Sequence, residues 1–79
     1  MQAPDPTRFI LVGTSHPGNV GAAARAMKVM GFSDLVLVAP RIAHPERRAE
    51  ARALASGALD VLDQVRIVDT IEAALDGLT

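Results

Sequence analysis

The stretch that decides the fold covers residues 8–40, RFILVGTSHPGNVGAAARAMKVMGFSDLVLVAP. It holds two unbroken apolar runs, Arg8–Val12 and Leu35–Val38, neither of which alternates with polar residues. Such runs are typical of parallel strands buried on both faces. Between them lie a glycine-rich turn and the segment Gly21–Met30, which is rich in helix-forming residues. The stretch therefore predicts a strand, a helix and a second strand.

Capping residues mark where the predicted helices begin and end. Asn19 is suited to cap the helix over Gly21–Met30, and Gly31 is suited to end it. Proline is tolerated in a first helical turn, and threonine is a good cap. These signals predict a helix over Pro45–Ser56 that ends at Gly57, a strand over Val65–Val68, and a helix over Ile71–Leu75 capped by Thr70.

The order β-α-β-α-β-α with short connections predicts an α/β fold with a parallel, right-handed three-strand sheet and three helices. Such a sheet has two open edges and only one interior strand. The sequence also ends in a helix, Ile71–Leu75, from which a further strand would follow. We therefore expect residues 1–79 to be the N-terminal part of a larger α/β domain, with a minimal free-standing domain as the alternative.

Composition restricts the class of protein. The 79 residues suffice for one small domain, and 49% hydrophobic with 22% charged residues indicates a chain that folds. The absence of cysteine excludes disulfides and cysteine-based zinc sites. The start, MQAPDPTR, does not resemble a signal peptide, and no uncharged stretch approaches the roughly 18 residues of a membrane span. We expect a cytoplasmic protein without a membrane segment.

The formal net charge of −1 conceals an uneven distribution. Residues 41–52 carry four arginines and two glutamates, whereas residues 53–79 carry one arginine and five acidic residues. The middle segment offers a local basic patch for RNA phosphates, although Glu46 and Glu50 partly neutralise it. A solvated helix face is the favoured interpretation. The arginines concerned are Arg41, Arg47, Arg48 and Arg52.

The turn after the first strand is the best candidate for a site, because ligands of open α/β sheets bind beyond the carboxyl ends of the strands. Gly13, Gly18 and Gly21 fall there, and glycine lets backbone N–H groups approach an anion. A P-loop is excluded because Asn19-Val20 replaces its Lys and Ser/Thr. The dinucleotide pattern G-x-G-x-x-G fails because Ser15 occupies the position of its middle glycine.

The segment from Thr14 to Phe32, TSHPGNVGAAARAMKVMGF, followed by LVLVAP, resembles the first motif of the SpoU/TrmH branch of the SPOUT RNA methyltransferases. It is most similar to the TrmJ-like tRNA ribose methyltransferases of bacteria. The segments ASGALDVL and IVDTIEAAL continue the likeness, which covers nearly the whole chain from Arg8. The resemblance implies the N-terminal half of a SPOUT α/β-knot domain.

This resemblance implies transfer of a methyl group from S-adenosylmethionine to a ribose 2′-hydroxyl of RNA, with tRNA as the expected substrate and a homodimer whose paired sites draw residues from both subunits. By position in the motif, Asn19 and Arg25 are the candidate catalytic residues. The candidate RNA-binding residues are Arg25, Gly18, Gly21 and His16. For His16, a turn residue held before Pro17 is the favoured alternative. His44, which also precedes a proline, has the same alternative.

Spacing supports a role for Arg25 near the turn. It lies six residues after Asn19, about 9 Å along a helix axis, and helical side chains lean towards the N-terminus. We expect its guanidinium to reach back to the positive end of the helix and to grip a phosphate as a bidentate fork. Because arginine keeps its proton, positioning and charge stabilisation are favoured over proton removal.

The other large apolar residues of this segment suit packing, and the chain lacks an aromatic platform for stacking bases. Val20, Met27, Met30 and Phe32 are the expected core residues.

Two departures from the family pattern limit these expectations. Gly13 stands where many relatives have an acidic residue. The family's second and third motifs, which form the knotted pocket for S-adenosylmethionine, lie beyond Thr79. We therefore assign no cofactor-binding or metal-binding residue within 1–79, and expect this segment alone to be inactive. Two alternatives remain: a non-catalytic RNA-binding or dimerising remnant, and a small nucleotide-binding enzyme of different chemistry.

Overall fold

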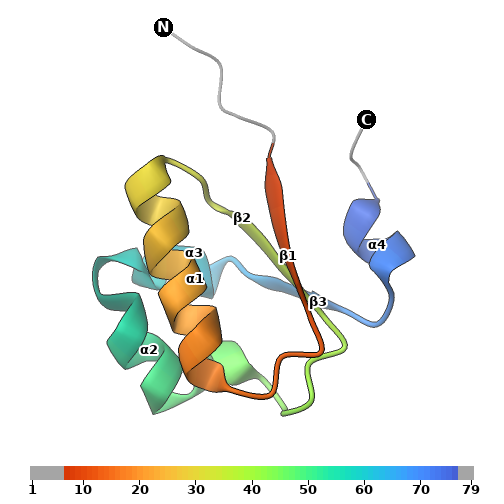
Figure 1. The fold of residues 1–79 in the computed structure, drawn as a ribbon, viewed down its shortest axis with the longest axis horizontal. Helices are drawn as coiled ribbons and strands as arrows, with labels where there is room; N and C mark the ends of the chain where they lie inside the picture. Colours follow the sequence, from red (N-terminus) through yellow and green to blue (C-terminus); the bar gives the residue numbers. More distant parts are fainter. Residues whose placement is uncertain (1–6, 77–79) are drawn as a thin grey trace, which may run out of the picture.

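The computed structural model describes residues 7–76. It contains a parallel sheet in the order β1-β2-β3, with α1, α2 and α3 on one face and α4 on the other (Figure 1). The strands are β1 (Arg8–Val12), β2 (Asp34–Val38) and β3 (Arg66–Val68). The α-helices are α1 (Pro17–Met30), α2 (Ala49–Ala55), α3 (Leu59–Asp63) and α4 (Ile71–Leu75), and the 3-10 turns are η1 (Pro45–Arg47) and η2 (Ser56–Ala58).

The strand predictions are confirmed, including the parallel pairing. In the register of the sheet Arg8 pairs with Asp34 and Val12 with Val38. Strand β2 is the interior strand and packs on both faces: Leu35 and Leu37 join the core beneath α1, α2 and α3, whereas Val36 and Val38 pack with Ala74 of α4. Burial on both faces explains why the sequence of β2 has no polar alternation.

Helix α1 begins earlier than its capping signals predict. It starts at Pro17, its N-cap is His16, and no side chain caps it. The prediction that Asn19 is the N-cap is therefore wrong. The physical reason is that proline has its φ angle already fixed at a helical value and suits the first helical position. The end at Gly31 is confirmed, since Gly31 adopts the left-handed conformation with φ 87°.

The predicted helix over Pro45–Ser56 is divided into shorter pieces. Arg48 is extended with ψ 145°, which separates η1 from α2, and Ser56 takes a positive φ of 47°, which ends α2. The turn at Ser56 directs a further helix, α3, onto the sheet, where Val61 and Leu62 are buried. Composition alone indicates one helix over this region. The chain turns within it because a single straight helix could not bury its successive groups of apolar residues.

Core predictions hold for three of the four residues. Val20 and Met27 are buried, and Phe32 is partly buried with its ring centroid 5.3 Å from that of Phe9. Met30 is 54% exposed, which contradicts its assignment to the core. It is the last residue of α1 and lines a surface hollow to which Leu54 of α2 also contributes.

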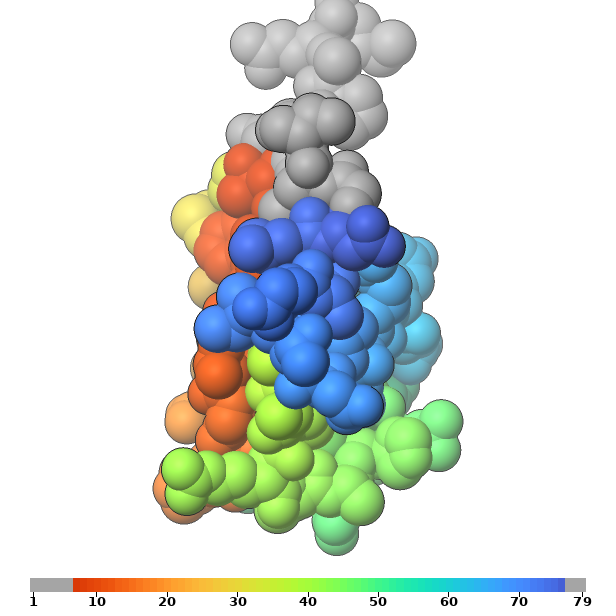
Figure 2. All heavy atoms as spheres, turned by 90° about the vertical axis from the view of Figure 1, so that its right-hand side faces the viewer, coloured from red at the N-terminus to blue at the C-terminus, as the bar shows by residue number. Residues whose placement is uncertain are grey.

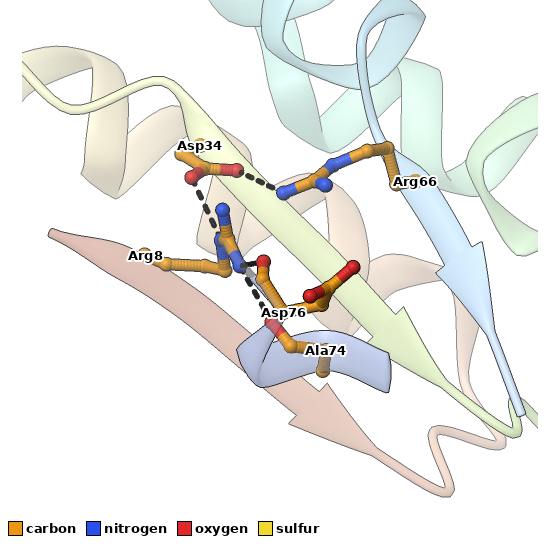
Figure 3. Close-up of polar contacts among 5 residues, drawn as sticks. All are labelled: Arg8, Asp34, Arg66, Ala74 and Asp76. Atoms are coloured by element: carbon orange, nitrogen blue, oxygen red, sulfur yellow. Dashed lines mark hydrogen bonds and ion pairs between the residues drawn. The ribbon is translucent and has the colours of Figure 1, made fainter. Parts of the chain in front are cut away.

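A polar cluster holds the amino edge of the sheet together with α4 (Figure 3). Arg8 Nε donates to Asp34 Oδ2 at 2.8 Å, and its NH1 donates to the carbonyl oxygens of Ala74 and Asp76, each at 2.7 Å. Arg66 NH2 donates to Asp34 Oδ1 at 3.1 Å. A cation at the carbonyl end of a helix is favourable, so Arg8 fastens α4 to β1.

Burial acts to raise the pKa of Asp34, but hydrogen bonds from Arg8 and Arg66, together with their positive charges, bring it below its ordinary value. Both oxygens of the Asp34 carboxylate accept from an arginine.

Candidate nucleic-acid interface

The turns after β1 and β2 meet at the carboxyl edge of the sheet, at the bottom of Figure 1, and the end of β3 adjoins them. Main-chain hydrogen bonds join them: Gly13 N donates to Val38 O at 2.9 Å, Arg41 N to Thr14 O at 2.9 Å, and Ala39 N to Val68 O at 2.8 Å. These bonds fix the turn before α1 against the loop that follows β2. The expected site position, beyond the carboxyl ends of the strands, is thus a connected surface.

His16 and Asn19 are both exposed at this edge. Asn19 lies in the first turn of α1, and its main-chain N–H donates to His16 O at 3.1 Å. Within residues 7–76 the amide side chain of Asn19 has no hydrogen-bond partner. Because it does not cap the helix, this side chain is available to a ligand.

Gly18 and Gly21 serve the packing of α1 against α2. A Cβ at Gly21 would lie 2.8 Å from the carbonyl carbon of Ala51 and nearer still to its oxygen. A Cβ at Gly18 would lie 2.7 Å from Glu50 Oε1 and 2.9 Å from a methyl group of Leu54. Both glycines are buried. Their spacing in the motif therefore has a structural cause, and contact between either one and RNA stays a prediction.

The expectation that the Arg25 guanidinium reaches back to the glycine-rich turn stays a prediction. The exposed side chain of Arg25 lines a shallow hollow of about 440 Å³ on the outer surface of α1, together with Ala22, Ala26, Val29, Met30 and Leu54. Because α1 starts at Pro17, Arg25 is the ninth helical residue, about 12 Å along the axis from the first.

Arg25 also has no polar partner of its own. It forms no ion pair or hydrogen bond with any residue of the described part of the chain. An unpaired arginine among apolar side chains is available to a group brought by another molecule. A catalytic role for Arg25 therefore requires a substrate or a second subunit to approach α1 from outside.

The arginines of residues 41–52 divide into two groups. Arg52 NH2 is 3.0 Å from Asp63 Oδ1, and Arg47 Nε is 3.7 Å from Glu46 Oε2, so these two have carboxylates nearby. For Arg52 and Arg47 the interpretation as a solvated, ion-paired helix face agrees with the structure. Arg41 and Arg48 are exposed and have no acidic partner among residues 7–76.

Glu46 is buried, which its position among arginines does not reveal. Only 11% of its side chain is exposed, and Oε1 has no hydrogen-bond partner among the described residues. Oε2 lies 3.5 Å from His44 Nδ1. The carboxylate borders a hollow of about 310 Å³ that Arg52, Asp63 and Val65 also line. The buried carboxylate of Glu46 thus offsets the positive charge of the neighbouring side chains.

Neither hollow suits S-adenosylmethionine. The hollow on α1 is lined by apolar side chains and one arginine, without acceptors for the amino-acid part of that molecule. The hollow at Glu46 is lined mainly by charged side chains and has no apolar slot for an adenine. Among residues 7–76 there is also no group of three or more His, Cys, Asp or Glu that could hold a metal ion.

No helix within residues 7–76 is long and apolar enough to cross a membrane.

Comparison with known proteins gives the family. The model of the SpoU rRNA Methylase family matches residues 6–79, and the chain belongs to that family. It is 60% identical over 73 residues to the tRNA (cytidine/uridine/adenosine-2'-O-)-methyltransferase TrmJ of Pseudomonas aeruginosa, covering 92% of this chain and 27% of that protein. It is 49% identical to the tRNA (cytidine/uridine-2'-O-)-methyltransferase TrmJ of Pectobacterium atrosepticum, covering 92% of this chain and 29% of that protein.

Solved structures agree with the fold. A probable methyltransferase from Bordetella pertussis superposes with a TM-score of 0.89 at 60% identity, covering 91% of this chain and 42% of that one. TrmJ from Z. mobilis superposes with a TM-score of 0.83 at 42% identity, covering 90% and 31%. The chain thus spans less than a third of the length of the two curated relatives. The predicted relationship to TrmJ-like enzymes is confirmed over this span.

Proposed function

We propose that this segment supplies the RNA-facing part of a tRNA ribose 2′-O-methyltransferase, in which residues 1–79 form the N-terminal part of the methyltransferase domain. The observation that carries the proposal is the motif around Asn19 and Arg25, exposed on α1 in a chain 60% identical to a tRNA 2′-O-methyltransferase. A cytoplasmic location goes with a tRNA substrate. In the complete protein, S-adenosylmethionine would supply the methyl group, which would leave its sulfur as the bond to the ribose 2′-oxygen forms and the hydroxyl proton is lost.

The roles of the two motif residues follow from their chemistry. The guanidinium of Arg25 keeps its charge at working pH, so it holds the phosphate beside the reacting ribose and stabilises negative charge on the 2′-oxygen. The amide of Asn19 can donate and accept hydrogen bonds, which suits contact with a ribose or phosphate of the RNA. Neither residue is an efficient general base.

The protein acts as a homodimer in this proposal, and the outer surface of α1 is where a second copy packs. Val29 is 82% exposed, Met30 54% and Leu54 47%, all around the same hollow. Packing a second subunit there buries these side chains and brings Arg25 towards the partner's site. Such an arrangement explains why Arg25 has no ligand-binding neighbours in its own subunit.

The test is transfer of labelled methyl groups from S-adenosylmethionine to tRNA by the protein expressed from its complete reading frame. The expected result is label in nucleotides methylated on the ribose 2′-oxygen. Label on the bases contradicts the proposal. Binding of tRNA without transfer identifies instead the non-catalytic RNA-binding alternative, and tight binding of ATP or NAD without either identifies a nucleotide-binding enzyme.

A further inference from the structure

The loop after β2 carries an arginine that the structure places against the motif turn. We infer that Arg41 is a substrate-binding residue that contacts a phosphodiester of the RNA backbone at the carboxyl edge of the sheet. This inference rests on the proposed function and extends it to a residue outside the motif.

The position of Arg41 is fixed by the fold. Its main-chain N–H donates to Thr14 O at 2.9 Å, so the residue is attached to the turn that leads into α1. Its side chain passes beside Gly13: Nε lies 3.8 Å from the point that a Cβ at Gly13 would occupy. The side chain of Arg41 therefore lies against the turn that leads into α1.

The backbone on both sides of Arg41 is strained, and an ordinary loop between two elements does not need such strain. Ala39 has φ 45° and His44 has φ 46°, both in the left-handed region that non-glycine residues seldom adopt. Backbone conformations of this kind are found most often at functional sites. The main-chain N–H of Ala39 donates to Val68 O at 2.8 Å, and this hydrogen bond attaches the strained turn to the sheet. The loop is thus built to present the residues between Ala39 and His44.

The charge of Arg41 is uncompensated. It is exposed and forms no ion pair with a described residue, whereas Arg47 and Arg52 have carboxylates nearby. Glu46 is a buried residue of η1 close to Arg47, whereas Glu50 is exposed, lies beside Gly18 in the first turn of α1 and forms no ion pair with a described residue. Asp69, which follows β3, is the remaining exposed acid at this edge. In Figure 2 the lime-green loop after β2 forms the lower margin of the molecule, below α4, and is open to a large partner.

A phosphodiester is the ligand that these features fit best. Arginine binds phosphate through two parallel N–H···O bonds, and contacts of this kind fix the register of a nucleic acid without reading its sequence. The described part of the chain offers no stacking platform at this edge, because Phe9 and Phe32 pack against each other beneath α1. Arg41 therefore contributes to the affinity for RNA and to the salt dependence of that affinity, whereas other residues contact the reacting ribose.

The test compares Arg41→Gln with Arg66→Gln in the protein from its complete reading frame. Arg66 lies at the opposite, amino edge of the sheet, so the second variant makes the same change in net charge away from the proposed contact. We expect Arg41→Gln to weaken tRNA binding by roughly tenfold at low salt and to reduce the slope of log affinity against log salt by about one. KM for tRNA rises by a similar factor while kcat is retained, and Arg41→Lys recovers part of the affinity.

Equal salt slopes and equal KM values in Arg41→Gln and the wild type overturn the inference while leaving the proposed function intact. An equal loss in Arg66→Gln overturns it too, because the effect is then one of net charge. If the wild-type protein itself neither binds nor methylates tRNA, the proposed function fails first. A lower kcat with unchanged KM assigns Arg41 to the chemical step and also contradicts the inference. Thermal unfolding of each variant checks that the fold is retained.

Discussion

Gly21 of α1 lies directly against the main chain of Ala51 in α2, with no room for a side chain between them. This contact explains how two helices of small residues approach closely enough to cover one face of the sheet. It also gives this glycine of the motif a structural role. Gly21, whose spacing in the motif predicts RNA binding, packs against α2, and its contact with RNA stays a prediction.

Substituting Gly21 tests this packing role. We expect Gly21→Ala to lower the free energy of unfolding by about 1–3 kcal/mol, since the added methyl group must displace the backbone of α2. The measurement is equilibrium unfolding in urea. Gly57→Ala is the matched control, because no atom lies within 4 Å of a Cβ at Gly57. A Gly21→Ala protein as stable as the Gly57→Ala protein would show that the helices are not in close contact.

A second comparison tests whether Asn19 acts only as a helix cap. Thr70 Oγ1 accepts from Ala73 N at 3.1 Å and caps α4, whereas Asn19 caps no helix. We expect Thr70→Ala to cost about 1 kcal/mol of stability and Asn19→Ala to cost almost nothing while lowering methyl transfer. Urea unfolding and the transfer assay measure the two effects. A loss of stability in Asn19→Ala equal to that in Thr70→Ala would restore the capping role.

The cluster at Asp34 predicts how stability depends on pH. Its folded-state pKa lies below the ordinary value of 3.8, so its stabilising effect is present above that value and is lost as pH falls through the folded-state pKa. The wild type should exceed Asp34→Asn in stability at about pH 6, and the difference should shrink below about pH 3.8.

Asp69→Asn provides the control for that measurement, because it removes one carboxylate at the other end of the sheet. Denaturant unfolding over a pH series gives the comparison. A difference between the wild type and Asp34→Asn that stays constant down to about pH 2 would rule out the coupling to Arg8 and Arg66.

The exposed surface of α1 predicts dimerisation. Val29→Glu places a charge in the hollow beside Arg25, where a second subunit would have to bury it. We expect a monomer by sedimentation at concentrations where the wild type is a dimer. Ala53→Glu, on an exposed position of α2 outside the hollow, should remain dimeric. If Val29→Glu sediments like the wild type, the interface lies elsewhere.

The sequence predicts those parts of the structure that are governed by local patterns. The apolar runs of β1 and β2, the left-handed end at Gly31 and the cap at Thr70 each depend on neighbouring residues, and each is confirmed. The start of α1 was misplaced because Pro17-Gly18 is equally typical of a turn.

The remaining features depend on contacts between distant residues. Arg8 meets Asp34 across 26 positions and Ala74 across 66, and no spacing rule indicates either contact. The burial of Glu46 and the fit of Gly21 against Ala51 likewise appear only when the helices pack. For Arg25, the motif identifies the residue, but the direction of its side chain depends on where α1 begins.

The most direct measurement of the central claim is the rate of methyl transfer from S-adenosylmethionine to tRNA ribose by the wild type and by Arg25→Lys. The claim predicts 2′-O-methylated tRNA from the wild type and a loss of about 100-fold or more in kcat for Arg25→Lys, because lysine keeps the charge but not the bidentate fork. Thermal unfolding and dimerisation should be unchanged. Full activity of Arg25→Lys, or methyl groups found only on bases, would contradict the account.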